Sequence, residues 1–279
     1  MPSWPTTRCD EASWSRSRRV RWVVFKNTAE LNPHLSRYWL NPNPQDPETF
    51  AQEVQCVCQC YHQAPELHEQ GTHTVSLDEM TGVQALERKH ATQPMKPGQV
   101  ERREFEYIRH GTQTLIANLE VATGQIIRPT VGQTRTEEDF VNHIAQTVAT
   151  DPQAQWIFIA DNLNTHRSES LVRYVAQTCG LADDLGQKGK RGVLKTMPCR
   201  TAFLTDPSHR IRFVYTPKHT SCLNQIEIWF SILMRRVIKR GNFTSIHDLR
   251  QKILDFIAYF NHTLAKPFKW TYTGRPLNV

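Results

Sequence analysis

The pattern of hydrophobic and polar positions changes near residue 71. From there on, short apolar runs alternate with helical repeats. Strands are predicted over residues 72–78, 114–121, 126–131, 156–160 and 211–215, and helices over residues 136–149, 166–177, 223–239 and 245–261. A short glycine-containing turn between the second and third strands predicts a hairpin. An initial run of strands, followed by alternating helices and strands, indicates the α/β class with a mixed sheet flanked by helices.

The first 70 residues are organised differently. Residues 1–45 are basic and rich in tryptophan, with a predicted helix over residues 20–31, and they run into the proline-rich stretch NPNPQDP. Residues 49–63 predict another helix. We therefore expect a short helical N-terminal segment and linker over residues 1–45, a connecting helix within residues 46–70, and one larger domain over residues 71–279.

Composition and charge narrow the classes of function. The chain is 39% hydrophobic and 22% charged, without the roughly 18 apolar residues in a row of a membrane helix and without an apolar signal core. We therefore expect a cytoplasmic protein with no membrane partner. The net charge of +7 favours a polyanionic partner, and residues 200–240 concentrate it, with eight Lys or Arg against two acids. Charge alone does not identify DNA, because many basic proteins bind none.

The cysteines raise the question of a zinc site. There are seven, an odd number that favours reduced thiols. Cys56, Cys58 and Cys60 form a run with His62 and His68 nearby. Zinc sites usually separate their cysteines by two to four residues and need a second ligand pair, whereas this run lies in a predicted helix. An ordinary structural role is therefore favoured.

Three acidic residues occupy positions typical of a divalent-metal site. Asp78 and Asp161 each follow a predicted strand, and reactive groups collect where strands end in α/β sheets. If the two strands are parallel neighbours, the carboxylates repel each other unless a cation neutralises them. Magnesium prefers such oxygen ligands. Glu227 lies on the flank of an apolar helical stripe, where an unpaired carboxylate is costly. The ordinary interpretations are turn residues for the two aspartates and an ion pair for Glu227.

Four sequence blocks resemble the catalytic blocks of mariner-like DDE transposases. In chain order they are VSLDEMTG at 75–82, YIRHGT at 107–112, IADNLNTH at 159–166 and YTPKHTSCLNQIEIWF at 215–230. Within that superfamily the chain resembles the bacterial insertion-sequence family 630. The resemblance implies an RNase H-like fold and a magnesium-dependent transposase, with manganese able to substitute. Such an enzyme cuts and joins DNA at the ends of an insertion sequence.

The resemblance also assigns residues and partners. Its catalytic and metal-binding acids correspond to Asp78, Asp161 and Glu227. Contacts to DNA, or to the acids themselves, are expected from His166, Lys218, His219, Asn224, Arg235, Arg236 and Lys239. For the first four of these, a surface or capping role is an equally good interpretation. The implied partners are double-stranded DNA, as element ends and as target, and a second copy of the chain. The implied location is the bacterial cytoplasm, in association with the nucleoid.

The chain departs from the family pattern in two places. About 70 residues precede the first catalytic strand, so residues 1–45 resemble only the last part of a helix-turn-helix region, and we expect a truncated copy. The interval between the second and third acids is long, which introduces the rival third acids Glu169, Asp183 and Asp184. Two other functions stay open: a decayed, non-catalytic remnant that only binds DNA, and an RNase H-like nuclease that acts on hybrids.

Overall fold

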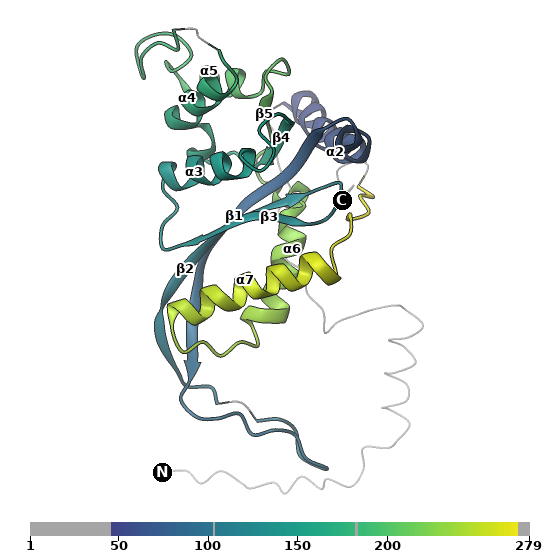
Figure 1. Ribbon diagram of the computed structural model, residues 1–279, viewed down its shortest axis with the longest axis vertical. Helices are drawn as coiled ribbons and strands as arrows, with labels where there is room; N and C mark the ends of the chain where they lie inside the picture. Colours follow the sequence, from purple (N-terminus) through teal and green to yellow (C-terminus); the bar gives the residue numbers. More distant parts are fainter. Residues whose placement is uncertain (1–45, 103, 182–183, 273–279) are drawn as a thin grey trace, which may run out of the picture. The chain divides into compact units, whose positions relative to one another are not determined.

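A five-stranded sheet in the order β3-β2-β1-β4-β5 forms the centre of the computed structural model, which describes residues 46–102, 104–181 and 184–272 (Figure 1). The strands are β1 (Thr72–Arg88), β2 (Tyr107–Glu120), β3 (Ile126–Gly132), β4 (Gln155–Ala160) and β5 (Ile211–Tyr215). The helices are α2 (Pro47–Glu69), α3 (Glu137–Val148), α4 (Glu169–Thr178), α5 (Met197–Leu204), α6 (Ile226–Leu233) and α7 (Ile246–Thr263). The predicted hairpin is the antiparallel pair β2–β3.

The central strand β1 joins two kinds of pairing. It runs antiparallel to β2 and parallel to β4, which in turn is parallel to β5. This is the RNase H-like mixed sheet that the resemblance implied. One expectation was wrong: β1 does not end at Asp78 but continues to Arg88, because its pairing with β2 extends well past the rest of the sheet. In Figure 1 the two strands form a long ribbon below the other strands.

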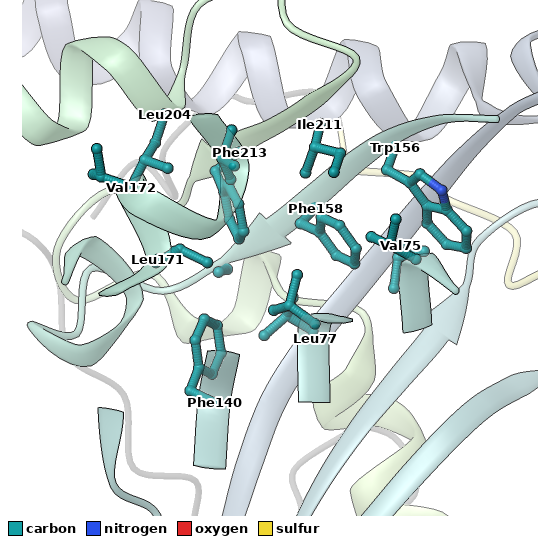
Figure 2. Close-up of a cluster of buried hydrophobic side chains, with 14 of the residues drawn as sticks. Val75, Leu77, Phe140, Trp156, Phe158, Leu171, Val172, Leu204, Ile211 and Phe213 are labelled. Atoms are coloured by element: carbon teal, nitrogen blue, oxygen red, sulfur yellow. The ribbon is translucent and has the colours of Figure 1, made fainter. Parts of the chain in front are cut away.

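One face of the sheet is covered by α3, α4 and α5. Inward side chains of β1, β4 and β5 meet the apolar stripes of these helices, as Figure 2 shows. Trp156, Phe158 and Phe213 are among the largest fully buried side chains, and successive rings stack with centroids 5.7 and 5.3 Å apart. Burial of this cluster fixes β4 between β1 and β5, since each Å² of apolar surface removed from water stabilises the folded state by about 25 cal/mol.

The opposite face carries two clusters. Helices α6 and α7 cover β1, β2 and β3, while α2 covers β4 and β5. Cys58 and Cys60 are buried in the α2 cluster, and Cys56 is exposed. Within the described part of the chain, no cysteine joins a group of potential metal ligands. Cys58 and Cys60 therefore contribute to packing between α2 and the sheet.

Helix boundaries differ from the predicted ones where side chains compete for the backbone. Thr136 caps α3 as expected, in a capping box with Asp139. The predicted helix from residue 166 begins only at Glu169, because the Ser168 hydroxyl accepts from Leu171 N at 3.2 Å. The helix predicted over residues 223–239 is shorter: α6 ends at Leu233 and continues as a π-helical turn, Met234–Ile238. Helix α5 was not predicted.

The proposed N-terminal region over residues 1–45 lies outside the described residues. The connecting helix is present as α2 and is longer than the predicted one, although Pro65 falls inside it. None of the helices in the described ranges has both the length and the apolar character that a membrane crossing requires.

Candidate active site

The first two acids lie side by side on neighbouring parallel strands. The β1–β4 register pairs Ser76 with Ile159, so Asp78 and Asp161 follow at the same level two residues later. Asp78 is within β1, and Asp161 follows the last residue of β4. The Asp161 carboxylate also accepts a hydrogen bond from Leu163 N at 3.0 Å, which orients it in the turn after β4.

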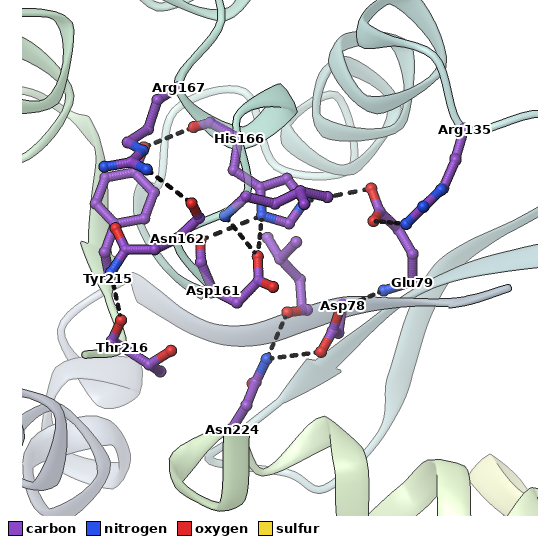
Figure 3. Close-up of polar contacts among 12 residues, drawn as sticks. Asp78, Glu79, Arg135, Asp161, Asn162, His166, Arg167, Tyr215, Thr216 and Asn224 are labelled. Atoms are coloured by element: carbon purple, nitrogen blue, oxygen red, sulfur yellow. Dashed lines mark hydrogen bonds and ion pairs between the residues drawn. The ribbon is translucent and has the colours of Figure 1, made fainter. Parts of the chain in front are cut away.

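Asn224 holds the start of α6 against β1, and thereby brings in the third acid. Its amide donates to the carbonyl of Leu77 at 2.9 Å and toward Asp78 Oδ2 at 3.4 Å. The Ser76 hydroxyl bonds Asn224 and also accepts from Ile226 N at 3.0 Å. Glu227 is in the first turn of the helix that these contacts anchor. Figure 3 shows Asn224 lying directly beneath Asp78.

The three carboxylates affect one another's protonation. Burial, with added repulsion from Asp161 and Glu227, raises the pKa of Asp78 from 3.8 to about 7. Burial and then the charge of Asp161 also raise the pKa of Glu227. Both carboxyls therefore bind protons more tightly than they would in water, as expected for clustered acids without a neutralising cation.

Asp161 is held in the opposite sense by a histidine. Burial alone raises the pKa of Asp161, but hydrogen bonding and the positive charge of His166 outweigh it, and the net pKa is lowered. His166 Nδ1 lies 2.8 Å from Asp161 Oδ1. Burial disfavours the charged ring, yet the carboxylates of Asp161 and Glu79 raise the pKa of His166 to about 9. At neutral pH the pair is an imidazolium and a carboxylate.

Glu79 completes this arrangement from the other face of β1. Successive residues of a strand point to opposite faces, so Asp78 faces α6 whereas Glu79 faces α3. Glu79 Oε1 lies 3.2 Å from His166 Nε2, and its side chain is only 3% exposed. The His166 ring is fully buried and stacks on Phe140 with centroids 4.2 Å apart. Figure 3 shows the ring between the two carboxylates. Sequence reasoning missed Glu79; its place beside Asp78 on a strand is the signal that could have found it.

The remaining predicted contact residues divide into buried and exposed sets. Asn224 and His166 are both buried. Asn224 is bonded to β1 through its amide and carbonyl, whereas His166 contacts the carboxylates of Asp161 and Glu79. The exposed set lies on the loop after β5 and on the π-helical turn and its end: Lys218, His219, Arg235, Arg236 and Lys239. His219 has φ of 62°, a left-handed conformation that is uncommon outside glycine and costs some strain.

The rival third acids are engaged elsewhere. Glu169 pairs with Arg173 on α4 at 2.6 Å, and Asp184 pairs with Arg191. Asp183 lies outside the described residues. Neither Glu169 nor Asp184 is among the charges that shift the pKa of Asp78, whereas Glu227 is.

Comparison with known proteins identifies the family of this chain. The sequence model of the DDE superfamily endonuclease family matches residues 73–250. The chain belongs to this family. The family's domain thus contains all three acids and every element of the sheet.

Solved structures similar to this DDE endonuclease chain include those of the Mos1 mariner transposase. Its paired end complex with Mn is 12% identical, with a TM-score of 0.47, over 87% of this chain and 65% of that one. Its catalytic domain is 10% identical, with a TM-score of 0.44, over 79% of this chain and 85% of that one. The chain thus spans 65% of the length of the Mos1 chain in the paired end complex. No curated protein matched.

The donor set of this DDE endonuclease domain fits a hard divalent cation. All three acids offer carboxylate oxygens, the ligands that Mg²⁺ and Mn²⁺ prefer. Burial and the neighbouring acids raise the pKa of Asp78, and a bound cation would lower it. In the described part of the chain, the ligand atoms of the three acids do not all lie within 4.8 Å of one another.

Proposed function

We propose that this chain is a transposase of the insertion-sequence family 630, which cleaves DNA strands at the ends of its element and joins them to target DNA. The observation that carries the proposal is the grouping of Asp78 with Asp161 on the neighbouring parallel strand and with Glu227 on α6, where burial and then the charges of these two acids raise the pKa of Asp78 to about 7. A partly buried carboxyl that neighbouring acids repel is costly for stability and is typical of a functional site.

Asp78, Asp161 and Glu227 would hold two Mg²⁺ ions, with Mn²⁺ able to substitute. When bound, the ions activate the attacking water or 3′-hydroxyl and stabilise the leaving oxygen. Phosphoryl transfer of this kind needs positioning and charge neutralisation and no protein nucleophile. The protein's own contribution is to orient the carboxylates and, through His166, to keep Asp161 ionised.

His166 and Asn224 supply that orientation. His166 binds Asp161 at 2.8 Å and is itself fixed by Glu79 and by stacking on Phe140. Residues that orient metal ligands in this way usually contribute 10- to 100-fold in activity or metal affinity. Asn224 positions the start of α6 against β1 and so sets where Glu227 lies.

Double-stranded DNA is the proposed partner, and the exposed basic residues are its proposed contacts. Arg235, Arg236 and Lys239 project from the segment that directly follows α6, and Lys218 and His219 lie in the loop after β5. Each phosphate contact by such a residue adds to binding in a salt-dependent way. A dimer of this chain on paired element ends is part of the proposal, as is a bacterial, nucleoid-associated location.

Nicking of a supercoiled plasmid by the full chain tests the proposal without knowledge of the element ends. We expect nicked product with Mg²⁺ or Mn²⁺ and none with a chelator. Asp161→Asn should lower the rate by at least about three orders of magnitude, because a catalytic acid is lost. Glu169→Gln, which removes a carboxylate paired on α4, should change it less than about twofold.

Two results would overturn the proposed enzyme activity. One is nicking by Asp161→Asn at the wild-type rate, which would place the activity elsewhere. The other is salt-dependent DNA binding without any product in either metal, which is the behaviour of a non-catalytic remnant.

A further inference from the structure

A second group of ionisable side chains gathers at the beginning of β1. His68 comes from the last turn of α2, His73 from the second residue of β1, and Glu120 from the last residue of β2. One potential ligand atom of each lies within 4.8 Å of the others. Five residues of β1 separate His73 from Asp78, roughly 17 Å along an extended strand, so this group is distinct from the acids described above.

The contacts inside this group leave polar atoms without partners. His73 Nδ1 lies 2.7 Å from Glu120 Oε2, but His68 Nδ1 lies 3.8 Å from Glu120 Oε1, too far for a hydrogen bond. His68 Nδ1 and Glu120 Oε1 are both buried and have no hydrogen-bond partner. The Glu120 side chain is 3% exposed. Buried unpartnered polar atoms are costly, and two that face each other across such a gap leave room for a shared cation.

The surrounding residues orient the His73 ring. Its other nitrogen, Nε2, lies 3.6 Å from Asp151 Oδ2, and the ring stacks on Trp156 with centroids 4.3 Å apart. The Trp156 indole donates to the carbonyl of Asp151 at 3.2 Å, which fixes that residue in turn. An imidazole whose second nitrogen faces a carboxylate is the usual surrounding of a metal-binding histidine.

The backbone brings the two histidines together through one tight turn. Gly71 links α2 to β1 with φ of +80°, and its N–H donates to the carbonyl of His68 at 3.0 Å. Glycine adopts this left-handed conformation at no steric cost, so helix and strand can meet within two residues. The β1–β2 register, in which Val75 opposes Glu120, then sets the carboxylate beside them.

We propose that His68, His73 and Glu120 form a structural site for a divalent transition metal of the zinc class, with Asp151 orienting His73. Two imidazoles and a carboxylate are ligands that zinc accepts, whereas magnesium prefers oxygen alone. Half-buried His68 leaves an open side for water as a fourth ligand. The metal would tie α2 to two strands of the sheet. The proposal does not depend on the proposed transposase activity.

Metal binding by the full chain, stripped with a chelator and dialysed, tests the site. Zn²⁺ titration with a competing chromophoric chelator gives affinity and stoichiometry, and the visible absorption of Co²⁺ reports a stand-in for zinc. We expect one Zn²⁺ per chain that His68→Gln loses, with affinity at least about 100-fold lower in that variant. Asp151→Asn should weaken binding about tenfold. Saturating Zn²⁺ should raise the wild-type Tm by roughly 5 °C at a hundredfold excess over Kd.

Three controls make the result decisive. His62→Gln removes an exposed histidine from the same helix and should bind as wild type does. Cys56→Ser removes the exposed thiol of the cysteine run and should do the same. Asp161→Asn should keep the cobalt spectrum, because its carboxylate belongs to the other group.

Two outcomes would overturn the site. The first is a wild-type chain that takes up no Zn²⁺ at micromolar concentration, which would make the group an ordinary histidine–carboxylate ion pair. The second is equal binding by His68→Gln and wild type, which would place the metal elsewhere. Because His68 is partly exposed near a helix end, its variant is expected to fold, and circular dichroism checks this.

Discussion

Two positions along β1 differ in the ligands they gather and in how their charges are balanced. Burial, followed by repulsion from the carboxylates of Asp161 and Glu227, raises the pKa of Asp78 to about 7. Around His73, five residues earlier, one buried carboxylate faces two imidazoles. At the first position carboxylates repel one another, and at the second two buried atoms lack hydrogen-bond partners.

The difference teaches how one strand can serve two purposes. Side chains beside the end of β4 lie at the sheet edge where reactive groups of α/β proteins gather. A bound cation can relieve the repulsion between them. Side chains at the beginning of β1 lie against α2 and the end of β2, where a contact holds the helix to the two strands. Variants at one position should therefore leave the other unaffected.

The largest expected effect distinguishes His166, beside the acids, from His73, at the beginning of β1. His166→Gln removes the positive charge between Asp161 and Glu79, and we expect nicking to slow by about 10- to 100-fold with a higher Mg²⁺ requirement. Glu79→Gln, one contact further away, should have a smaller effect of the same kind. The Mg²⁺ dependence of the rate is the measurement, since a purely structural defect would not shift it.

The matched variant lies at the other position. His73→Gln should remove Zn²⁺ binding and leave the Mg²⁺ requirement of nicking unchanged. If His73→Gln raised that requirement as much as His166→Gln does, the two positions would not be independent and the comparison would fail.

The next effect concerns stability without metal. Asp78→Asn should raise the free energy of unfolding at pH 8, in the presence of a chelator, by about 1–3 kcal/mol, because a buried repelled carboxylate is replaced by a neutral amide. The folded state keeps the Asp78 proton between about pH 4 and 7, where the unfolded chain has released it. The contribution of this carboxyl to stability is therefore greatest below pH 4 and declines as the pH rises to about 7.

Urea unfolding across this pH range measures the effect. The wild type should show the decline between pH 4 and 7 that this carboxyl contributes, and Asp78→Asn should lack that component. An Asp78→Asn variant that is less stable than wild type at pH 8 would mean that the carboxylate is already compensated by the protein. Zn²⁺ should not alter the difference, because its site is elsewhere on β1.

The smallest effect tests whether Arg235 contacts DNA. Arg235→Ala should weaken binding to duplex DNA a few-fold at about 0.1 M salt and lower the slope of log affinity against log salt by about one. Arg173→Ala is the control, because that exposed arginine is paired with Glu169 on α4. Equal salt slopes for both variants would remove Arg235 from the proposed DNA contacts.

Local pattern in the sequence was enough for much of the fold. The apolar residues of β2 and β3, the continuous apolar run of β4 and the helix start at Thr136 are short-range signals. A strand or helix formed at each, although β2 begins at Tyr107 and not at residue 114. Local pattern put Asp78 and Asp161 at strand positions, but only the parallel pairing of β1 with β4 makes those strands neighbours. Glu227 entered through the resemblance and the helical stripe around it.

Tertiary structure alone decided the rest, because it depends on which strands pair and in what register. Pairing with β2 extends β1 past Asp78. The local sequence holds no signal that ends the strand there. Glu79 meets His166 across 87 positions of sequence, and Glu120 meets His73 across 47. A one-residue slip in register would turn each of these side chains to the opposite face, so the polar groups beneath the acids and beside α2 exist only once the sheet has formed.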